Sequence, residues 1–171
     1  REETTTMCLI PKVIQAVKIP VIAAGGVGTG RAMLAAMNLG ADAVQIGSRF
    51  IATPESSAHE NFKKAILAVD EGDTQLTLKE LTPVRLVKNE FFKNVQSAYE
   101  KGASKVDLET LLGRGRAKKG MYEGDLLDGE LEVGQVSALI TEIKPAAAIV
   151  EEIVTEFKEA LNEQNHEKFK F

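Results

Sequence analysis

The stretch Ile19-Pro-Val-Ile-Ala-Ala-Gly-Gly-Val-Gly-Thr-Gly30 decides the fold class of this 171-residue chain. Its apolar part, residues 21–24, shows no polar alternation, which is typical of a parallel strand covered on both faces. Gly25 and Gly26 allow a sharp turn and leave no Cβ between the backbone and a ligand. A helix that begins after them presents unpaired N–H groups and a positive dipole end. The stretch therefore predicts either a site for an anion such as phosphate or a plain connection from strand to helix.

The pattern of strand, glycine and helix occurs a second time. Residues 30–39 are rich in Ala and Met and predict a helix that ends at Gly40. The segment Asp42-Ala-Val-Gln-Ile-Gly-Ser-Arg-Phe50 then predicts a short strand that also leads into a glycine and a hydroxyl residue. Alternating strands and helices predict parallel crossovers and an α/β fold, in which ligands bind at the carboxyl ends of the strands. In α/β barrels the last two strand–helix loops often bind phosphate, so two such turns together favour a phosphate site.

Two more helices are predicted from capping residues and apolar spacing. Residues 4–6 are threonines and candidate caps of a helix that extends to Val17. Pro11 is expected in its first turn, because proline lacks the N–H that later turns need. Ser57-Ala-His-Glu60 has the spacing of a capping box at the start of another helix. That helix carries an apolar stripe that we expect to be buried: Phe62, Ile66 and Val69.

Beyond Gly72 the pattern predicts a mostly helical extension with one extended segment at 83–88. Asp107 is a candidate cap of a short helix over 108–112. Pro145 is expected at the first position of a last helix with one apolar face. We expect three parts in chain order: the α/β portion at 1–72, the extension at 73–144, and the C-terminal helix and tail at 145–171.

Composition excludes several classes of function. The formal net charge is −4, and the 21 basic and 25 acidic residues are scattered, so no basic face suits a nucleic acid. No apolar run approaches the roughly 20 residues of a membrane-spanning helix, and no signal peptide opens the sequence, which predicts a cytoplasmic protein without membrane contact. Arg1 is followed by polar residues before any strand, from which we expect the sequence to begin inside a longer protein.

Few side chains are candidates for catalysis or metal binding. Cys8 is the only cysteine, so no intrachain disulfide is expected, and no His/Cys cluster has metal-ligand spacing. His59 is expected in the first turn of a helix, exposed or locally bonded, and His166 lies in a charged tail. With only these two histidines, a Ser-His-Asp arrangement is not credible. The residues therefore predict no metal site, and neither histidine is proposed as catalytic.

Two motifs each have two interpretations. The segment 113–120 concentrates positive charge among glycines, which fits either a contact with an anion, such as a negatively charged substrate tail, or a solvated helix start. Its cations are Arg114, Arg116, Lys118 and Lys119. Gln135 opens a predicted apolar helix over 134–143, where its amide either points at a bound ring or serves as a cap or surface group.

Together these motifs resemble the nitronate monooxygenase family, once called the 2-nitropropane dioxygenases, and the related FMN-type enoyl-acyl carrier protein reductases. The resemblance is carried by 19–27 and 40–50. It continues along nearly the whole chain through Ser57-Ala-His59, Pro83-Val-Arg85, Lys88-Asn89, Glu123-Gly-Asp125 and Gly134-Gln135. It implies an α/β fold that is the C-terminal part of a (β/α)₈ TIM barrel. This part consists of the last two strand–helix units and the mostly helical extension, and the N-terminal part of the barrel is absent from this chain.

By resemblance, the two glycine turns bind the phosphate of FMN through backbone N–H groups and a hydroxyl. The implied cofactor-binding residues follow the seventh and eighth strands: Gly25, Gly26, Val27, Gln45, Gly47 and Ser48. Ser48 stands where the family more often has threonine, which keeps the hydroxyl. Gln135 is a possible contact of the flavin or the substrate. The family's catalytic histidine lies in a glycine-rich motif before the segment that begins here, so no catalytic residue is expected in this chain.

The implied activity is FMN-dependent oxidation of nitronates or nitroalkanes with O₂, in which the flavin carries the redox chemistry. One alternative is an FMN-dependent enoyl-acyl carrier protein reductase that uses NAD(P)H, with 113–120 helping to hold an acidic carrier or a dinucleotide. The other is a non-catalytic piece, because two strands cannot close a barrel. Such a piece requires the N-terminal half of its own barrel, pairs with a second copy, or aggregates. The resemblance also suggests a homodimer.

Overall fold

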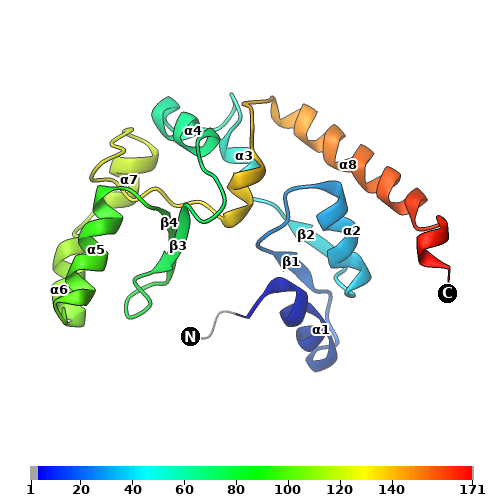
Figure 1. The fold of residues 1–171 in the computed structure, drawn as a ribbon, viewed down its shortest axis with the longest axis horizontal. Coiled ribbons are helices and arrows are strands. Elements are labelled where there is room, and N and C mark those ends of the chain that lie inside the picture. Colours follow the sequence, from blue (N-terminus) through cyan, green and yellow to red (C-terminus); the bar gives the residue numbers. More distant parts are fainter. Residues whose placement is uncertain (1–3, 171) are drawn as a thin grey trace. The chain divides into compact units, whose positions relative to one another are not determined.

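The computed structural model describes residues 4–170, which form two compact units, one of residues 4–55 and 144–170 and one of residues 56–143. Figure 1 shows helices and strands in both units, and the α/β class predicted from the sequence is confirmed. The first unit contains α1 (Thr6–Ala16), β1 (Ile22–Ala24), α2 (Gly30–Asn38), β2 (Ala43–Gln45), α3 (Ser48–Ile51), α8 (Ala146–Glu163) and the 3₁₀ helix η2 (Glu167–Phe169). The second contains α4 (Glu60–Leu67), β3 (Thr74–Thr77), β4 (Val84–Val87), α5 (Glu90–Glu100), α6 (Lys105–Leu112), α7 (Arg116–Met121) and the 3₁₀ helix η1 (Gln135–Leu139).

In the first unit, β1 and β2 form a parallel two-stranded sheet joined by α2. Ala23 lies in a small core built with α1 and α2, whose other buried members are Ile10, Ala36 and Ala41. The opposite side of β1 is open, and Ile22 is 61% exposed. The prediction that β1 is covered on both faces is therefore wrong for this chain, because burial of a parallel strand needs a packed layer on each face.

α8 lies along α2, as Figure 1 shows, and its packing depends on a glycine. A Cβ at Gly30 would lie 2.2 Å from the backbone nitrogen of Phe157 and 2.3 Å from the carbonyl oxygen of Ile153. The helix buries Ile149 and Ile153, which confirms the first half of the predicted apolar face, whereas Leu161 on the same face is 45% exposed. Pro145 caps α8 rather than occupying its first turn, one residue away from the predicted position.

The second unit is built on an antiparallel hairpin of β3 and β4, in which Thr74 pairs with Val87 and Thr77 with Val84. Residues 131–133 run along the outer edge of β4, with Glu132 bridged to Leu86. Helices α5 and α6 cover the hairpin over a core of Leu78, Leu86, Phe91, Phe92, Val95 and Leu108. The sequence predicted β4 but not β3, so the extension is less purely helical than expected.

Four local predictions need correction. His59, not Ser57, caps α4: its Nδ1 accepts from the N–H of Asn61 at 3.1 Å. Ser104 caps α6 and forms a capping box with Asp107, so the helix begins three residues earlier than expected. Pro11 lies inside α1, because the helix already begins at Thr6. The predicted helix over 134–143 is only the short η1.

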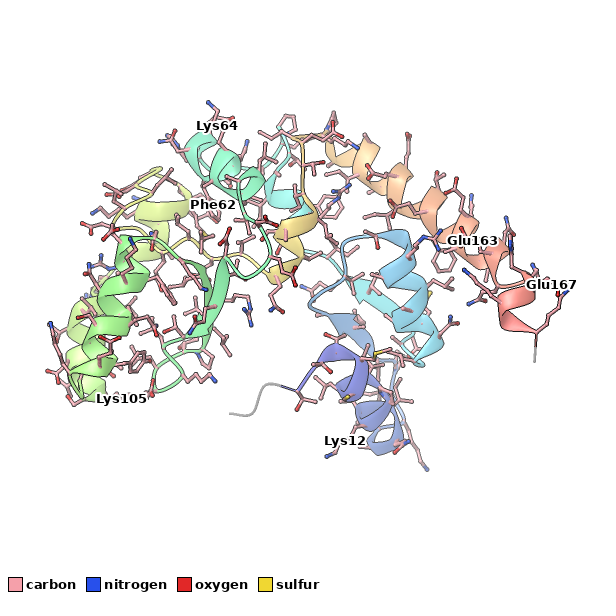
Figure 2. The ribbon with its side chains drawn as sticks, viewed as in Figure 1. Lys12, Phe62, Lys64, Lys105, Glu163 and Glu167 are labelled. Carbon is pink, nitrogen blue, oxygen red and sulfur yellow. The ribbon has the colours of Figure 1, made fainter. Side chains whose placement is uncertain are left out.

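The apolar stripe predicted for α4 is confirmed, with Phe62 and Ile66 fully buried and Val69 buried just beyond the helix. Figure 2 shows Phe62 on the inner side of α4 and Lys64 on its outer side.

Candidate functional site

The two glycine turns leave the same edge of the parallel sheet. Ala24 and Gln45, the last residues of β1 and β2, are paired. Because the strands are parallel, Gly25 and Gly26 follow one carboxyl end and Gly47 and Ser48 follow the neighbouring one. The structure thus brings together the residues that the sequence singled out from two separate motifs, and it does so within one unit.

The first turn has a backbone that only glycine adopts without strain. Gly25 has φ +97° and Gly26 has φ +76°, both in the left-handed region. The hydroxyl of Thr6 donates to the carbonyl oxygen of Gly25 at 3.1 Å, which fixes the turn against the start of α1. A Cβ at Gly25 would meet no atom of the described residues within 4 Å, so the space beside this backbone is open. Val27, the next residue, is buried, and its packing holds the end of the turn in place.

The second turn begins α3. Gly47 precedes the helix, and its carbonyl oxygen accepts from the N–H of Phe50 at 2.9 Å. A Cβ at Gly47 would also meet no described atom within 4 Å. Gln45 is exposed at the end of β2, on the uncovered side of the sheet. Both turns therefore combine exposed backbone with free space beside a glycine, which is what close approach of a phosphate requires.

The start of α2 is not the phosphate site that the first motif suggested. The N–H of Gly30, its first residue, donates to Oε2 of Glu156 on α8 at 2.7 Å. The hydroxyl of Thr29 accepts from the N–H of Ala32 at 3.1 Å. An anion does lie at this helix terminus, but it is a carboxylate of the chain itself. The candidate phosphate site consists of the two turns and not of the α2 terminus.

A pocket of about 180 Å³ opens beside the first turn, between α1 and α2. Apart from Thr6 and the turn glycines, its walls are apolar side chains of Met7, Ile10, Val27, Ala32, Ala35, Ala36 and Leu39. An apolar lining does not suit a phosphate, so this pocket and the anion-binding backbone are neighbouring but chemically different surfaces.

The basic segment of 113–120 is used for internal structure. Arg116 donates to the carbonyl oxygens of Leu111, Leu112 and Asp128 at 3.0, 2.7 and 2.8 Å, and its guanidinium lies 4.5 Å from the centre of the Phe91 ring. This arrangement ends α6 and ties it to the loop before 131–133. The geometry favours the structural interpretation of the segment over an anion contact.

Two lysines of the same segment also have acidic partners. Lys118 pairs with Glu123 at 2.9 Å, and Lys119 pairs with Asp125 at 3.0 Å and with Asp128 at 3.3 Å. The backbone N–H of Asp128 and, after it, the ammonium of Lys119 hold the pKa of Asp125 below its usual range, and the carboxylates of Asp125 and Asp128 raise the pKa of Lys119.

The remaining candidates have no catalytic geometry. His59 is a helix cap packed against Gly124, where a Cβ would lie 2.2 Å from its Nδ1. His166 caps the terminal 3₁₀ helix, and Cys8 is exposed. Among residues 4–170, no group of three or more His, Cys, Asp or Glu side chains is placed to hold a metal ion. Gln135 is exposed at the start of η1 in the second unit.

Sequence reasoning missed the acidic residues of α8 that contact the helices following the two turns. Glu156 bonds to Gly30, 126 positions earlier, and Glu152 bonds to Arg49, 103 positions earlier. No local spacing signals pairs so far apart in the chain. The pattern of α8 shows only that Glu152 and Glu156 belong to its polar side.

The model of the nitronate monooxygenase family matches residues 1–156. The chain belongs to the nitronate monooxygenase family. The resemblance seen in the sequence motifs is therefore confirmed, and the match includes both glycine turns and most of α8.

Individual relatives agree with the family. A probable nitronate monooxygenase of Staphylococcus saprophyticus is 33% identical over 159 residues, which make up 92% of this chain and 44% of that protein. The structure of FabK from Thermotoga maritima matches with a TM-score of 0.85 and 41% identity, covering 95% of this chain and 51% of FabK. Nitroalkane oxidase from Streptomyces ansochromogenes matches with a TM-score of 0.75 and 32% identity, covering 95% of this chain and 48% of that enzyme.

The chain spans about half the length of these three proteins. Within the part of the chain that the structure describes, no helix combines the length and apolarity needed to cross a membrane.

Proposed function

We propose that the whole protein containing this chain is an FMN-dependent oxidoreductase of nitronate monooxygenase type, and that this chain holds the phosphate of FMN. The observation that carries the proposal is the pair of glycine turns at one edge of the sheet, each with open space where a side chain would otherwise lie. Family membership supports the reaction type.

The residues present fit a phosphate monoester. Gly25, Gly26 and Gly47 offer backbone N–H groups without a covering side chain, and Ser48 adds a hydroxyl. Val27 fixes the first turn through its burial. Gln45 stands at the end of β2 with an amide that is exposed for contact with the flavin. The sequence-based prediction that Gln135 contacts the flavin or the substrate stays a prediction.

When bound, FMN supplies the electron transfer that oxidises a nitronate, and O₂ accepts the electrons. The residues of this chain bind and orient the cofactor by its phosphate. We propose no proton transfer by this chain, because His59 serves as the cap of α4 and His166 stands at the start of η2. The base belongs to the part of the family fold that this chain does not span.

The experiment that tests the function uses the purified whole protein. We expect a yellow preparation with a flavin absorption spectrum and nitronate-dependent O₂ uptake. A colourless protein that binds no added FMN would contradict the proposal. Residues 1–171 expressed alone are expected to show no turnover, because two strands cannot close a barrel and the face of β1 that carries Ile22 is uncovered. Nitronate oxidation by that fragment would show that this last point is wrong.

Gly47→Ala is expected to weaken FMN binding by about 10- to 100-fold, since displacing one charge-assisted hydrogen bond costs roughly 1.5–3 kcal/mol. Gly47 has φ −110°, which alanine adopts, and the added methyl group meets no described atom. The fold should therefore be unaffected, while the approach of the phosphate is blocked. Fluorescence titrations with FMN and with riboflavin, which has no phosphate, measure the effect. Equal affinities of variant and wild type for FMN would remove Gly47 from the site.

The second candidate function is an FMN-dependent enoyl-acyl carrier protein reductase. It is favoured by the likeness to FabK, which at 41% identity exceeds the 32% identity to nitroalkane oxidase. Comparing NADH consumption with a crotonyl thioester against nitronate-dependent O₂ uptake discriminates the two. No reduction of the thioester eliminates the reductase, and its rapid reduction without nitronate oxidation replaces the first candidate.

A further inference from the structure

α8 carries two carboxylates that bond to the two helices following the glycine turns. Glu156 accepts from the N–H of Gly30, the first residue of α2, at 2.7 Å. Glu152 accepts through Oε1 from Nη2 of Arg49 in α3, at 2.6 Å. Because the two glutamates are spaced i and i+4, they lie on the same side of α8. One helix face thus contacts the segment that follows each turn.

The Glu152 contact is shared between two cations. Its Oε2 also accepts from Nζ of Lys144 at 2.7 Å. Lys144 and, to a lesser extent, Arg49 hold the pKa of Glu152 below its usual range, so the carboxylate stays ionised. The Arg49 side chain is only 11% exposed, and its buried Nε has no hydrogen-bond partner among residues 4–170. Loss of the carboxylate would leave a buried guanidinium without its counter-ion, which is strongly unfavourable.

Two further hydrogen bonds join the segment after α3 to the start of α8. The N–H of Lys144 donates to the carbonyl oxygen of Ala52 at 3.3 Å, and the N–H of Ala146 donates to Oε1 of Glu55 at 2.9 Å. Ala52 and Thr53, which follow α3, are both buried. The segment that follows α3 is therefore bonded to the start of α8, in addition to the pair of Arg49 with Glu152.

We propose that Glu152 and Glu156 are positioning residues, which hold the two phosphate-binding turns at the separation that one phosphate group requires. This inference rests on the proposed function, because it assumes that FMN bonds to both turns at once. The pairing of β1 with β2 sets where the two turns leave the sheet, and the contacts of α2 and α3 hold the other end of each turn. A shift of about 1 Å between them is enough to misplace donors around one ligand.

The test measures dissociation constants of the whole apoprotein for FMN and for riboflavin. Glu152→Gln keeps the shape of the side chain and removes its charge, and we expect FMN to bind about tenfold more weakly while riboflavin binding is unchanged. Glu156→Ala is expected to have the same selective effect. Glu156→Gln keeps an acceptor for the Gly30 N–H and is expected to restore FMN affinity.

Glu163→Gln is the matched control. Figure 2 shows Glu163 near the C-terminal end of α8, and its carboxylate pairs with Arg31 of α2, with Nη1 to Oε2 at 2.9 Å. The substitution removes an ion pair between the same two helices, and it leaves the bond from Gly30 to Glu156 and the pair of Arg49 with Glu152 in place. We expect it to leave both flavin affinities unchanged.

The outcomes separate this inference from the proposed function. A wild-type protein that binds FMN no more tightly than riboflavin contradicts the phosphate site itself. If the wild type prefers FMN and both Glu152→Gln and Glu156→Ala keep that preference, the positioning role is overturned. An equal loss of FMN and riboflavin affinity also overturns it, because that result indicates general loss of structure. If Glu152→Gln does not fold, the comparison of Glu156→Ala with Glu156→Gln decides.

Discussion

Replacing Gly30 with alanine is expected to lower the free energy of unfolding by about 3 kcal/mol or more, at the upper end of the range for over-packing. The new Cβ would lie 2.2 Å from the nitrogen of Phe157 and 2.3 Å from the carbonyl oxygen of Ile153. Both are backbone atoms of α8, so no side-chain rotation relieves the overlap and the two helices must separate. Separation breaks the bond from Gly30 to Glu156 and uncovers the apolar side of α8.

Chemical denaturation of the Gly30→Ala protein, followed by circular dichroism, measures this loss. Gly47→Ala is the matched control in the same unit, because its added methyl group lies in open space and its φ of −110° suits alanine. We expect the control to stay within about 1 kcal/mol of the wild type. Equal midpoints for Gly30→Ala and the wild type would mean that α8 does not pack on α2 as described.

The sequence predicted the two glycine turns well because their causes are local. An apolar run before Gly25 and Gly26, and a second before Gly47, determine where each strand ends and where the chain turns. The family resemblance then predicted a cofactor site at the same turns. The partner of the N–H at the start of α2 was not predictable, since the carboxylate that binds the Gly30 N–H belongs to Glu156, 126 residues later. A glycine that looks like part of a ligand-binding loop is there to admit another helix.

Other differences between the predicted and the observed structure also arise from contacts between residues far apart in the sequence. The strand β3 was missed because Thr74–Thr77 is short and has no clear alternation, and its pairing with β4 is what makes it a strand. The cap of α4 is His59 and not the predicted Ser57. The N–H of His59 donates to the carbonyl oxygen of Met121, and this contact with a distant segment fixes where α4 begins. The sequence allowed two interpretations of the cations of 113–120, because it does not show which acidic residues they pair with. In the structure Lys119 pairs with Asp125 and Asp128.

The stability of the second unit is expected to depend on pH through Glu130. This side chain is only 7% exposed, between Gly129 and the segment that runs along β4. Burial and, to a lesser extent, the nearby carboxylate of Glu132 raise its pKa to about 7, against the opposing effect of Arg116. Because the folded protein holds this proton more tightly than the unfolded chain, the favourable contribution is complete below about pH 4.5 and is lost as the pH rises through 7.

Glu130→Gln is therefore expected to make the protein more stable than the wild type by about 3 kcal/mol at pH 8 and to leave its stability nearly unchanged at pH 4.5, since each unit of pKa shift corresponds to about 1.4 kcal/mol. Urea denaturation of both proteins between pH 4.5 and 8 measures the difference. Glu132→Gln on the same segment is the comparison variant. Burial also raises the pKa of the Glu132 carboxyl, so this substitution is expected to increase stability at pH 8 as well. The increase is expected to be smaller, because Glu132 is only half-buried. A stability difference between Glu130→Gln and the wild type that does not change with pH would contradict the assignment, because only a group that titrates in this range makes the difference grow as the pH rises.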